Sequence, residues 1–218
     1  MKISITLKII TLTFIVNFIS IFSDIAHANC YDSSIMAPGT IGTASPCLNM
    51  LIVDKEALED GRNTGYAITG PDSNSYTFAD STYNIFTGQV TSMNNLFRFK
   101  NFNDDISYWD TSNVTDMGNM FRDNDIFGQD LGNWDVSNVT NMSEMFRGSR
   151  FLNNNDITEW DVSNVTNMSL MFKDSDDFNQ DISVWNTSSV TTYTRMFENT
   201  TLMINNYNAP STPDISWF

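Results

Sequence analysis

Residues 134–146 read WDVSNVTNMSEMF, and a variant of this phrase occurs four times along the chain. Each copy begins with a tryptophan, and these tryptophans recur every 25 or 26 residues. Such a period is typical of repeat proteins, in which one unit cannot bury its apolar face alone and stacks on copies of itself. The sequence therefore predicts a repeat protein whose function lies on a surface. The tryptophans are Trp109, Trp134, Trp160 and Trp185.

The repeat unit has a constant half and a variable half. The tryptophan and the final phenylalanine of the phrase are 12 residues apart in every unit, whereas 12, 13 or 14 residues separate that phenylalanine from the next tryptophan. Insertions in the variable half do not disturb stacking, so we predict about five coils over residues 89–198. Besides the tryptophans, the predicted core consists of Val114, Val139, Val165, Met117, Met142, Met168, Phe121, Phe146 and Phe172.

The spacing within a unit predicts one short helix and one short strand. Valine at i, methionine at i+3 and Met-Phe at i+6 and i+7 form one face of a helix of about two turns. The segment leading to each tryptophan, such as 105–109, fits a short strand in a parallel stack, with a bend before the tryptophan. We therefore expect an α/β repeat solenoid of short parallel strands stacked with short helices.

The two flanks of the repeats differ from them. We expect residues 29–88 to form an N-terminal cap, with a helix over 48–60 that ends at a glycine and two strands at 66–68 and 76–78. Residues 199–218 are predicted to be a tail that covers the last coil, because a stack of repeats needs a cover at its open ends.

The first 28 residues are typical of a secretory signal. Lys2 and Lys8 precede the apolar stretch 9–22, and Ala26-His27-Ala28 fits a small-residue cleavage site. A membrane-spanning helix is the alternative, but this stretch is short for a bilayer and no second one follows, so we expect no membrane segment after cleavage. Acylation of Cys30 is another alternative. It is less favoured because His27-Ala28-Asn29 is a poor match to the small residues that such processing requires.

Net charge and histidine content exclude several classes of function. Without residues 1–28 the chain has 9 basic and 25 acidic residues, a net charge of −16. Nucleic acid and anionic membranes are therefore poor partners, since both need basic surfaces. The sole histidine, His27, lies in the signal, which excludes histidine-based nucleophile activation and imidazole metal ligands.

Two cysteines, Cys30 and Cys47, precede the repeats. In an exported chain we expect them to form one disulfide, although two free thiols or a crosslink to a partner are alternatives. Closing such a loop contributes about 3 kcal/mol by the chain-entropy estimate.

Stacking places equivalent charged residues above one another at about 4.8 Å, the spacing of neighbouring strands. Adjacent carboxylates at that spacing repel by roughly 3.5 kcal/mol at an effective dielectric of 20, so each aspartate is expected to accept hydrogen bonds in an Asx-type turn. A row of Ca²⁺ ions is the alternative, with 123–125 and 174–177 as further candidates. The first acidic column is Asp105, Asp130, Asp156 and Asp181, with Asp214 as a fifth member, and the second is Asp110, Asp135 and Asp161, ending in Asn186.

Two other columns have structural explanations. The basic column follows each phenylalanine, where we expect its cations to complement helix C-termini, with a binding stripe for an acidic partner as the alternative. The N-V-T sequences at Asn113, Asn138 and Asn164 follow the repeat, so we interpret each asparagine as a hydrogen-bond donor to the turn backbone of its own or the next coil rather than as a glycosylation site. The basic column is Arg98, Arg122, Arg147 and Lys173.

Residues 102–121 and 151–172 resemble the repeat of the BspA-like leucine-rich-repeat surface proteins of bacteria, which reads much like F-N-x-D-I-S-x-W-D-V-S-N-V-T-x-M-x-x-M-F. The resemblance covers about half of the chain and decays in the last unit. It implies a leucine-rich-repeat-like solenoid and a role in surface attachment or partner binding that varies among members.

We therefore expect a secreted or cell-surface module that binds a protein or surface glycan, without catalytic residues or a required cofactor. A calcium-stabilised structural surface protein is the alternative. A hydrolase that uses paired carboxylates comes third, because repetition explains every acidic column and none contains a unique pair.

Overall fold

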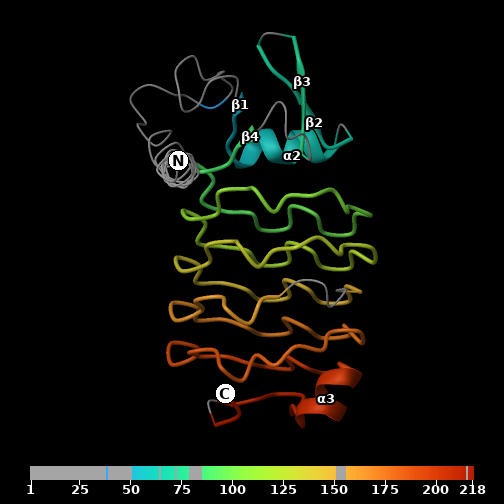
Figure 1. Cartoon of the computed structure of the whole chain (residues 1–218), viewed down its shortest axis with the longest axis vertical. Helices are drawn as coiled ribbons and strands as arrows, with labels where there is room; N and C mark the ends of the chain where they lie inside the picture. Colours follow the sequence, from blue (N-terminus) through green and yellow to red (C-terminus); the bar gives the residue numbers. More distant parts are fainter. Residues whose placement is uncertain are drawn as a thin grey trace, which may run out of the picture.

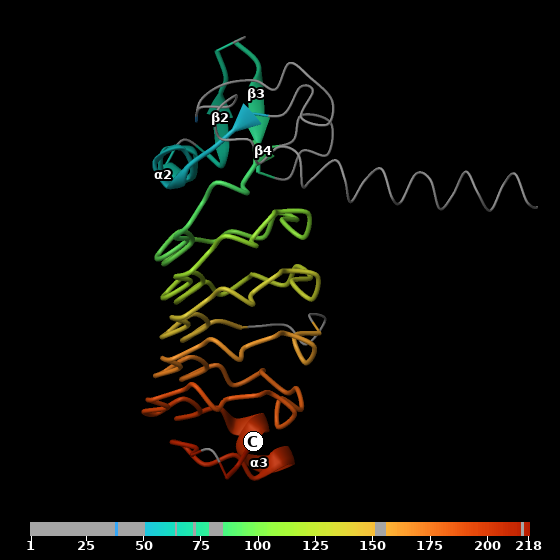
Figure 2. The same cartoon turned by 90° about the vertical axis from the view of Figure 1, so that its left-hand side faces the viewer.

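The repeats form a stack of coils along the long axis of the molecule, with a cap at the N-terminal end (Figures 1 and 2). Each coil is one repeat of about 25 residues, and we number the coils one to five by Phe97, Phe121, Phe146, Phe172 and Phe197. In this computed structural model the described residues are 38, 51–63, 65–71, 73–78, 85–150, 156–214 and 216–218.

Neighbouring coils are joined by a ladder of parallel backbone contacts. Single parallel bridges connect one residue of each coil to its equivalent in the next. Threonine N–H groups extend the ladder, because Thr140 donates to the carbonyl of Thr115 at 2.9 Å and Thr166 to that of Thr140 at 2.9 Å. The bridged residues are Ser92, Asp116, Asn141, Asn167 and Thr192.

The segment from methionine to the basic residue is a chain of overlapping turns in every coil. In the second coil, the N–H of Met120 bonds to the carbonyl of Met117, and that of Arg122 to Asn119, each at 3.2 Å. The intervening N–H groups donate to the next coil instead. Those of Met117, Asn119, Phe121 and Asp123 reach carbonyls of the third coil at 3.0, 2.8, 2.9 and 2.8 Å.

The prediction of an α/β solenoid with stacked helices and strands is wrong. Among the described residues there are two short helices, both outside the coils, and the coils contain isolated bridges in place of strands. The predicted helices do not form because positive φ angles recur in the turns, for example 57° at Asn119 and 54° at Asp123. A helix needs negative φ throughout, and the N–H groups that would bond within it serve the neighbouring coil.

Phenylalanines fill the interior of the stack. The rings of Phe97, Phe121, Phe146, Phe172 and Phe197 are fully buried and stack in one column, with centroids of successive rings 5.5, 5.6, 5.7 and 6.0 Å apart. Burying one such side chain contributes about 1.5–3 kcal/mol. This column is therefore a main source of cohesion between coils.

The four repeat tryptophans are buried beside the phenylalanines. Three of them also link consecutive coils through the indole N–H, because Nε1 of Trp134, Trp160 and Trp185 donates at 3.1 Å to the carbonyls of Ile106, Leu131 and Ile157. The predicted valine and methionine core positions are buried as well. These are Val114, Val139, Val165, Met117, Met142 and Met168.

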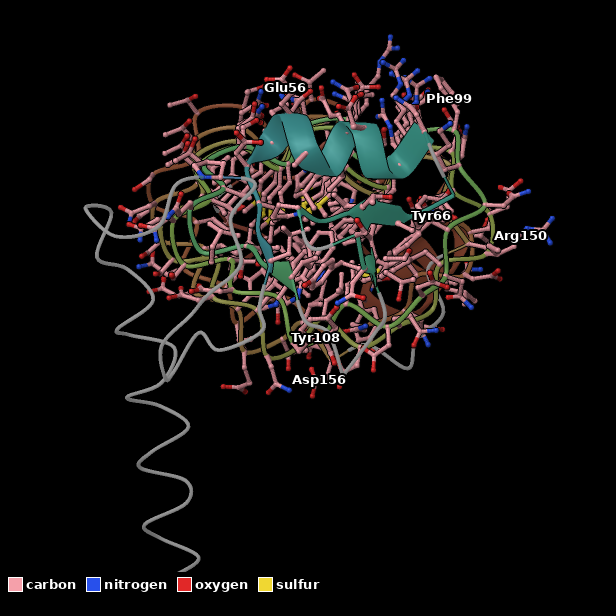
Figure 3. The ribbon with its side chains drawn as sticks, turned by 90° about the horizontal axis from the view of Figure 1, so that it is seen from above. Glu56, Tyr66, Phe99, Tyr108, Arg150 and Asp156 are labelled. Carbon is pink, nitrogen blue, oxygen red and sulfur yellow. The ribbon has the colours of Figure 1, made fainter. Side chains whose placement is uncertain are left out.

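The described part of the N-terminal cap contains one helix and two small pairs of strands. Strand β1 (Leu51–Ile52) pairs in parallel with β4 (Ile85–Phe86), and β2 (Ala67–Thr69) pairs antiparallel with β3 (Ser75–Thr77). The expected pair of strands around a turn is thus confirmed, one residue from its predicted bounds. Helix α2 lies across the end of the stack (Figure 3).

Helix α2 spans Lys55–Asn63, so the expectation of a helix over 48–60 that stops at Gly61 is wrong in its bounds. Asp54 sets its start, because Oδ1 accepts the N–H of Ala57 at 2.9 Å. Gly61 lies inside the helix, where a Cβ would come within 2.8 Å of side-chain atoms of Ile68 and Phe78. The glycine therefore permits close packing and does not end the helix.

The last coil is covered by the C-terminal segment. Helix α3 (Thr201–Tyr207) lies at the foot of the stack (Figure 1). Beyond it, the carbonyl of Ser211 accepts the N–H of Phe197 at 3.1 Å, and the ring of Trp217 lies 5.2 Å from that of Phe197. The C-terminal segment thus makes the backbone and ring contacts to the fifth coil that a further coil would otherwise make.

Candidate functional site

Aspartates of both acidic columns form Asx-type turns, as the sequence predicts. In the second column, Oδ1 of Asp135 accepts the N–H of Ser137 at 3.0 Å and its hydroxyl at 2.6 Å. In the first column, Asp156 accepts the N–H and hydroxyl of Thr158 at 3.0 and 2.6 Å. The C-terminal Asp214 makes the same pair of bonds to Ser216.

These bonds lower the pKa of three exposed aspartates below the ordinary value. For Asp156, Asp161 and Asp214 the larger cause is the side-chain hydroxyl and the smaller one the backbone N–H of the residue two positions on. Both donors stabilise the charged carboxylate. The columns are thus explained by local turn formation at the corner of each coil.

The two acidic segments proposed for calcium are engaged in protein contacts. The side chain of Asn124 is buried and donates to the carbonyl of Phe102 at 3.1 Å. Asp174 accepts the side-chain amide of Asn199 at 2.7 Å, and Asp176 accepts the hydroxyl of Thr201 at 2.9 Å. Across the described ranges, no group of three or more His, Cys, Asp or Glu side chains is placed to hold a metal ion.

The N-V-T asparagines bond to backbone as scaffold residues, but to the preceding coil and not, as the sequence interpretation had it, to their own or the next coil. Their side-chain amides donate to backbone carbonyls one repeat earlier, at 2.9 Å for Asn113, 2.8 Å for Asn138 and 2.8 Å for Asn164. A second scaffold column lacked a prediction: in coils two to five, small polar side chains three residues after the phenylalanine are buried and donate to carbonyls of the preceding coil, namely Asn124, Ser149, Ser175 and Thr200. Their identity as Asn, Ser or Thr at one repeat position was the available signal.

The explanation of the basic column by helix dipoles is wrong, because these residues follow turns and not helices. Carboxylates neutralise most of the column instead. Oε2 of Glu144 lies 2.7 Å from Nη1 of both Arg122 and Arg147, and its hydrogen bond to Arg147 raises the pKa of that guanidinium. Lys173 pairs with Glu198 at 2.9 Å.

The first coil departs from this pattern. Arg98 donates Nη1 to the side-chain oxygen of Asn95 at 3.2 Å, and no carboxylate within the described part of the chain pairs with it. The next residue, Phe99, is 62% exposed with φ of 56°. Sequence reasoning missed this place, although a phenylalanine where other coils have Asp123, Gly148, Asp174 or Asn199 was a visible signal.

Several sequence predictions fall outside the described residues. The signal over 1–28 and both cysteines, Cys30 and Cys47, belong to this part of the chain. In the parts that are described, no helix has the length and apolar character needed to cross a membrane.

Comparison with known proteins identifies a family. The family described as "Mycoplasma protein of unknown function, DUF285" matches residues 72–156 and 129–216, which together cover more than half of the 218 residues. No curated protein and no solved structure matches the chain. The family match is compatible with the resemblance to bacterial surface repeat proteins. The chain belongs to the DUF285 family.

Proposed function

With membership of the DUF285 family as the premise, we propose that the protein is a secreted or cell-surface module that binds a partner through the outer surface of its stacked coils. The observation that carries this proposal is that repeated polar positions in the coils are engaged in forming the turns of each coil and in holding neighbouring coils together. Aspartates close Asx turns, asparagines bond to the preceding coil and most of the basic column is ion-paired. Exposed positions that vary between coils are then available for recognition.

The shape of the stack supports a binding role. Coils of similar outline lie one above another along the long axis, so side chains from several coils form continuous outer faces (Figure 2). Repeat proteins use such extended surfaces for binding. One position that differs from coil to coil lies directly before the tryptophan. It is occupied by Asn133, Glu159 and Val184, which are all exposed.

The relation to BspA-like surface proteins is the finer part of the proposal. It is supported by the F-N-x-D-I-S-x-W-D pattern of residues 102–110 and by the family match. A C-terminally tagged chain expressed in a bacterial host should be recovered from the medium or the cell surface with its N-terminal signal removed. Retention of an uncleaved chain in the cytoplasm would contradict the export that this relation implies.

Partner binding is tested by immobilising the purified protein and incubating it with extracts of host surface proteins and of cell walls. The control variant keeps the core and replaces the exposed variable residues, for example Asn133, Glu159 and Val184, by serine. We expect one or a few components to be retained by the protein and to bind again after purification, and comparison with the variant shows whether these three positions take part. Retention of no component by the unchanged protein would refute the proposed function.

A further inference from the structure

The first coil carries a positively charged patch in an otherwise acidic chain. We define the Phe99 patch as Arg62, Arg98 and Phe99. Two cations converge on Asn95, because Nη1 of Arg62 donates to its carbonyl at 2.8 Å and Nη1 of Arg98 to its side-chain oxygen at 3.2 Å. Neither acceptor is charged, and within the described ranges no carboxylate forms an ion pair with either guanidinium.

Later coils neutralise the equivalent positions. Arg122 lies 3.1 Å from Asp123, and Glu144 bridges Arg122 and Arg147. In the first coil the residue equivalent to Asp123 is Phe99, and the residue equivalent to Glu144 is Asn95. Coils two to four each have a carboxylate at one of these two positions, whereas the first coil has neutral residues at both.

Phe99 is exposed in a conformation that does not suit it. Its φ of 56° lies in the left-handed region, which favours Gly, Asn and Asp over bulky residues. Its ring is 62% exposed, and the guanidinium carbons of Arg98 and Arg122 lie 4.5 and 5.7 Å from the ring centroid. Burial therefore does not explain a phenylalanine here, and a strained exposed residue of this kind points to recognition.

Taking the proposed binding role as given, we propose that the Phe99 patch binds an acidic segment of a partner protein. Guanidinium groups recognise carboxylates through charge-assisted, often bidentate hydrogen bonds, and the exposed ring offers apolar contact to a neighbouring side chain. Arginine and aromatic residues are the types that dominate binding energy at interfaces.

One observation favours an acidic peptide over an anionic glycan, and a second concerns the access of an acidic partner to the patch. The guanidinium of Arg98 lies over the Phe99 ring, so the ring face that it covers is not free to stack on a sugar. The first acidic column is distant from the patch, because Asp156 of that column lies at the opposite edge of the molecule from Phe99 (Figure 3). An acidic partner can therefore reach the patch without facing that column.

The probe is a fluorescently labelled ten-residue peptide of glutamates and leucines, with a version carrying glutamine for glutamate as its control. Fluorescence anisotropy with the full chain should show binding of the glutamate peptide that weakens as salt is raised, and at least tenfold weaker binding of the glutamine peptide. We expect Arg98→Gln and Phe99→Asn each to weaken binding about tenfold. The matched control Arg150→Gln removes an exposed arginine elsewhere and should change affinity less than about twofold.

Four outcomes would overturn the proposal: no peptide binding, equal loss in the Arg150→Gln control, binding of an acidic polysaccharide in place of the peptide, or self-association that Arg98→Gln abolishes. Thermal melts of both patch variants establish that they fold, and Phe99→Asn should melt no lower than the unchanged chain. If these variants still retain the partners captured from extracts, the patch proposal fails and the proposed function stands. If no partner is retained by the unchanged chain, the proposed function itself fails.

Discussion

Replacing Trp160 by alanine tests whether the tryptophan column holds the coils together. The side chain is 4% exposed, its ring lies 6.4 Å from Phe146 and 6.5 Å from Trp185, and its Nε1 donates to the carbonyl of Leu131. Truncating a buried tryptophan costs about 3–5 kcal/mol. The Leu131 carbonyl keeps the N–H of Trp134 as a donor at 3.0 Å, so the lost indole hydrogen bond adds little and we expect a cost of about 4 kcal/mol, the middle of this range.

Urea denaturation followed by fluorescence of the remaining tryptophans measures this cost. With a slope of about 2–3 kcal/mol per molar urea, the midpoint should fall by roughly 1.5–2 M. Val184→Ala is the control, because this side chain is 71% exposed and its loss should shift the midpoint very little. A Trp160→Ala midpoint within about 0.3 M of that control would refute the reasoning and reassign the column to the surface.

Four further predictions concern single features. Phe99→Asn should raise the free energy of unfolding by about 1 kcal/mol in urea denaturation, because asparagine tolerates φ of 56° better; a loss would show that the ring is part of the core. Gly132→Ala should lower the thermal midpoint, since its Cβ would lie 2.6 Å from the carbonyl oxygen of Asp156, and overpacking costs about 1–3 kcal/mol; an unchanged melt would mean that the corner yields freely. The pKa values of Asp156, Asp161 and Asp214 are lower in the folded protein than the ordinary value of 3.8, so their contribution to stability should be full above pH 3.8 and be lost as the pH falls through the folded values. Thermal melts at several pH values measure this loss. A thermal midpoint that rises as the pH falls through this window would contradict the stabilising role of the Asx turns. Thermal midpoints with calcium and with chelator should coincide, and a calcium-dependent increase would revive the metal alternative.

The sequence predicts the interior of the stack better than its backbone. The constant 12-residue distance from tryptophan to phenylalanine aligns the units and predicts that residues such as Trp134 and Phe146 are core residues. Both side chains are buried. The apolar spacing of i, i+3 and i+6 is shared by a helix and by overlapping turns with i to i−3 bonds, so it does not distinguish them. The residues that adopt positive φ include Glu144 and Leu170, whose side chains give no sequence signal for that conformation.

Local polar geometry was predictable where a residue and its partner are close in sequence. The D-x-S pattern places a serine hydroxyl and N–H beside Asp135, and the structure forms both bonds. Contacts between repeats depend on register, so the link of Glu144 to two arginines could not be derived from one sequence. The Phe99 patch was overlooked because the first unit was aligned by Val90, Met93 and Phe97, residues that it shares with the following units.

The turns that send alternate N–H groups to the next coil also determine how the protein bears load. These hydrogen bonds run between coils, along the direction in which the coils are stacked (Figure 1). A force that pulls the two ends of the stack apart would break the hydrogen bonds between one pair of coils at a time, instead of breaking those of all coils together. If the protein links two surfaces under flow, it would lengthen in steps of one repeat and yield from an end, leaving the remaining coils folded and able to close again.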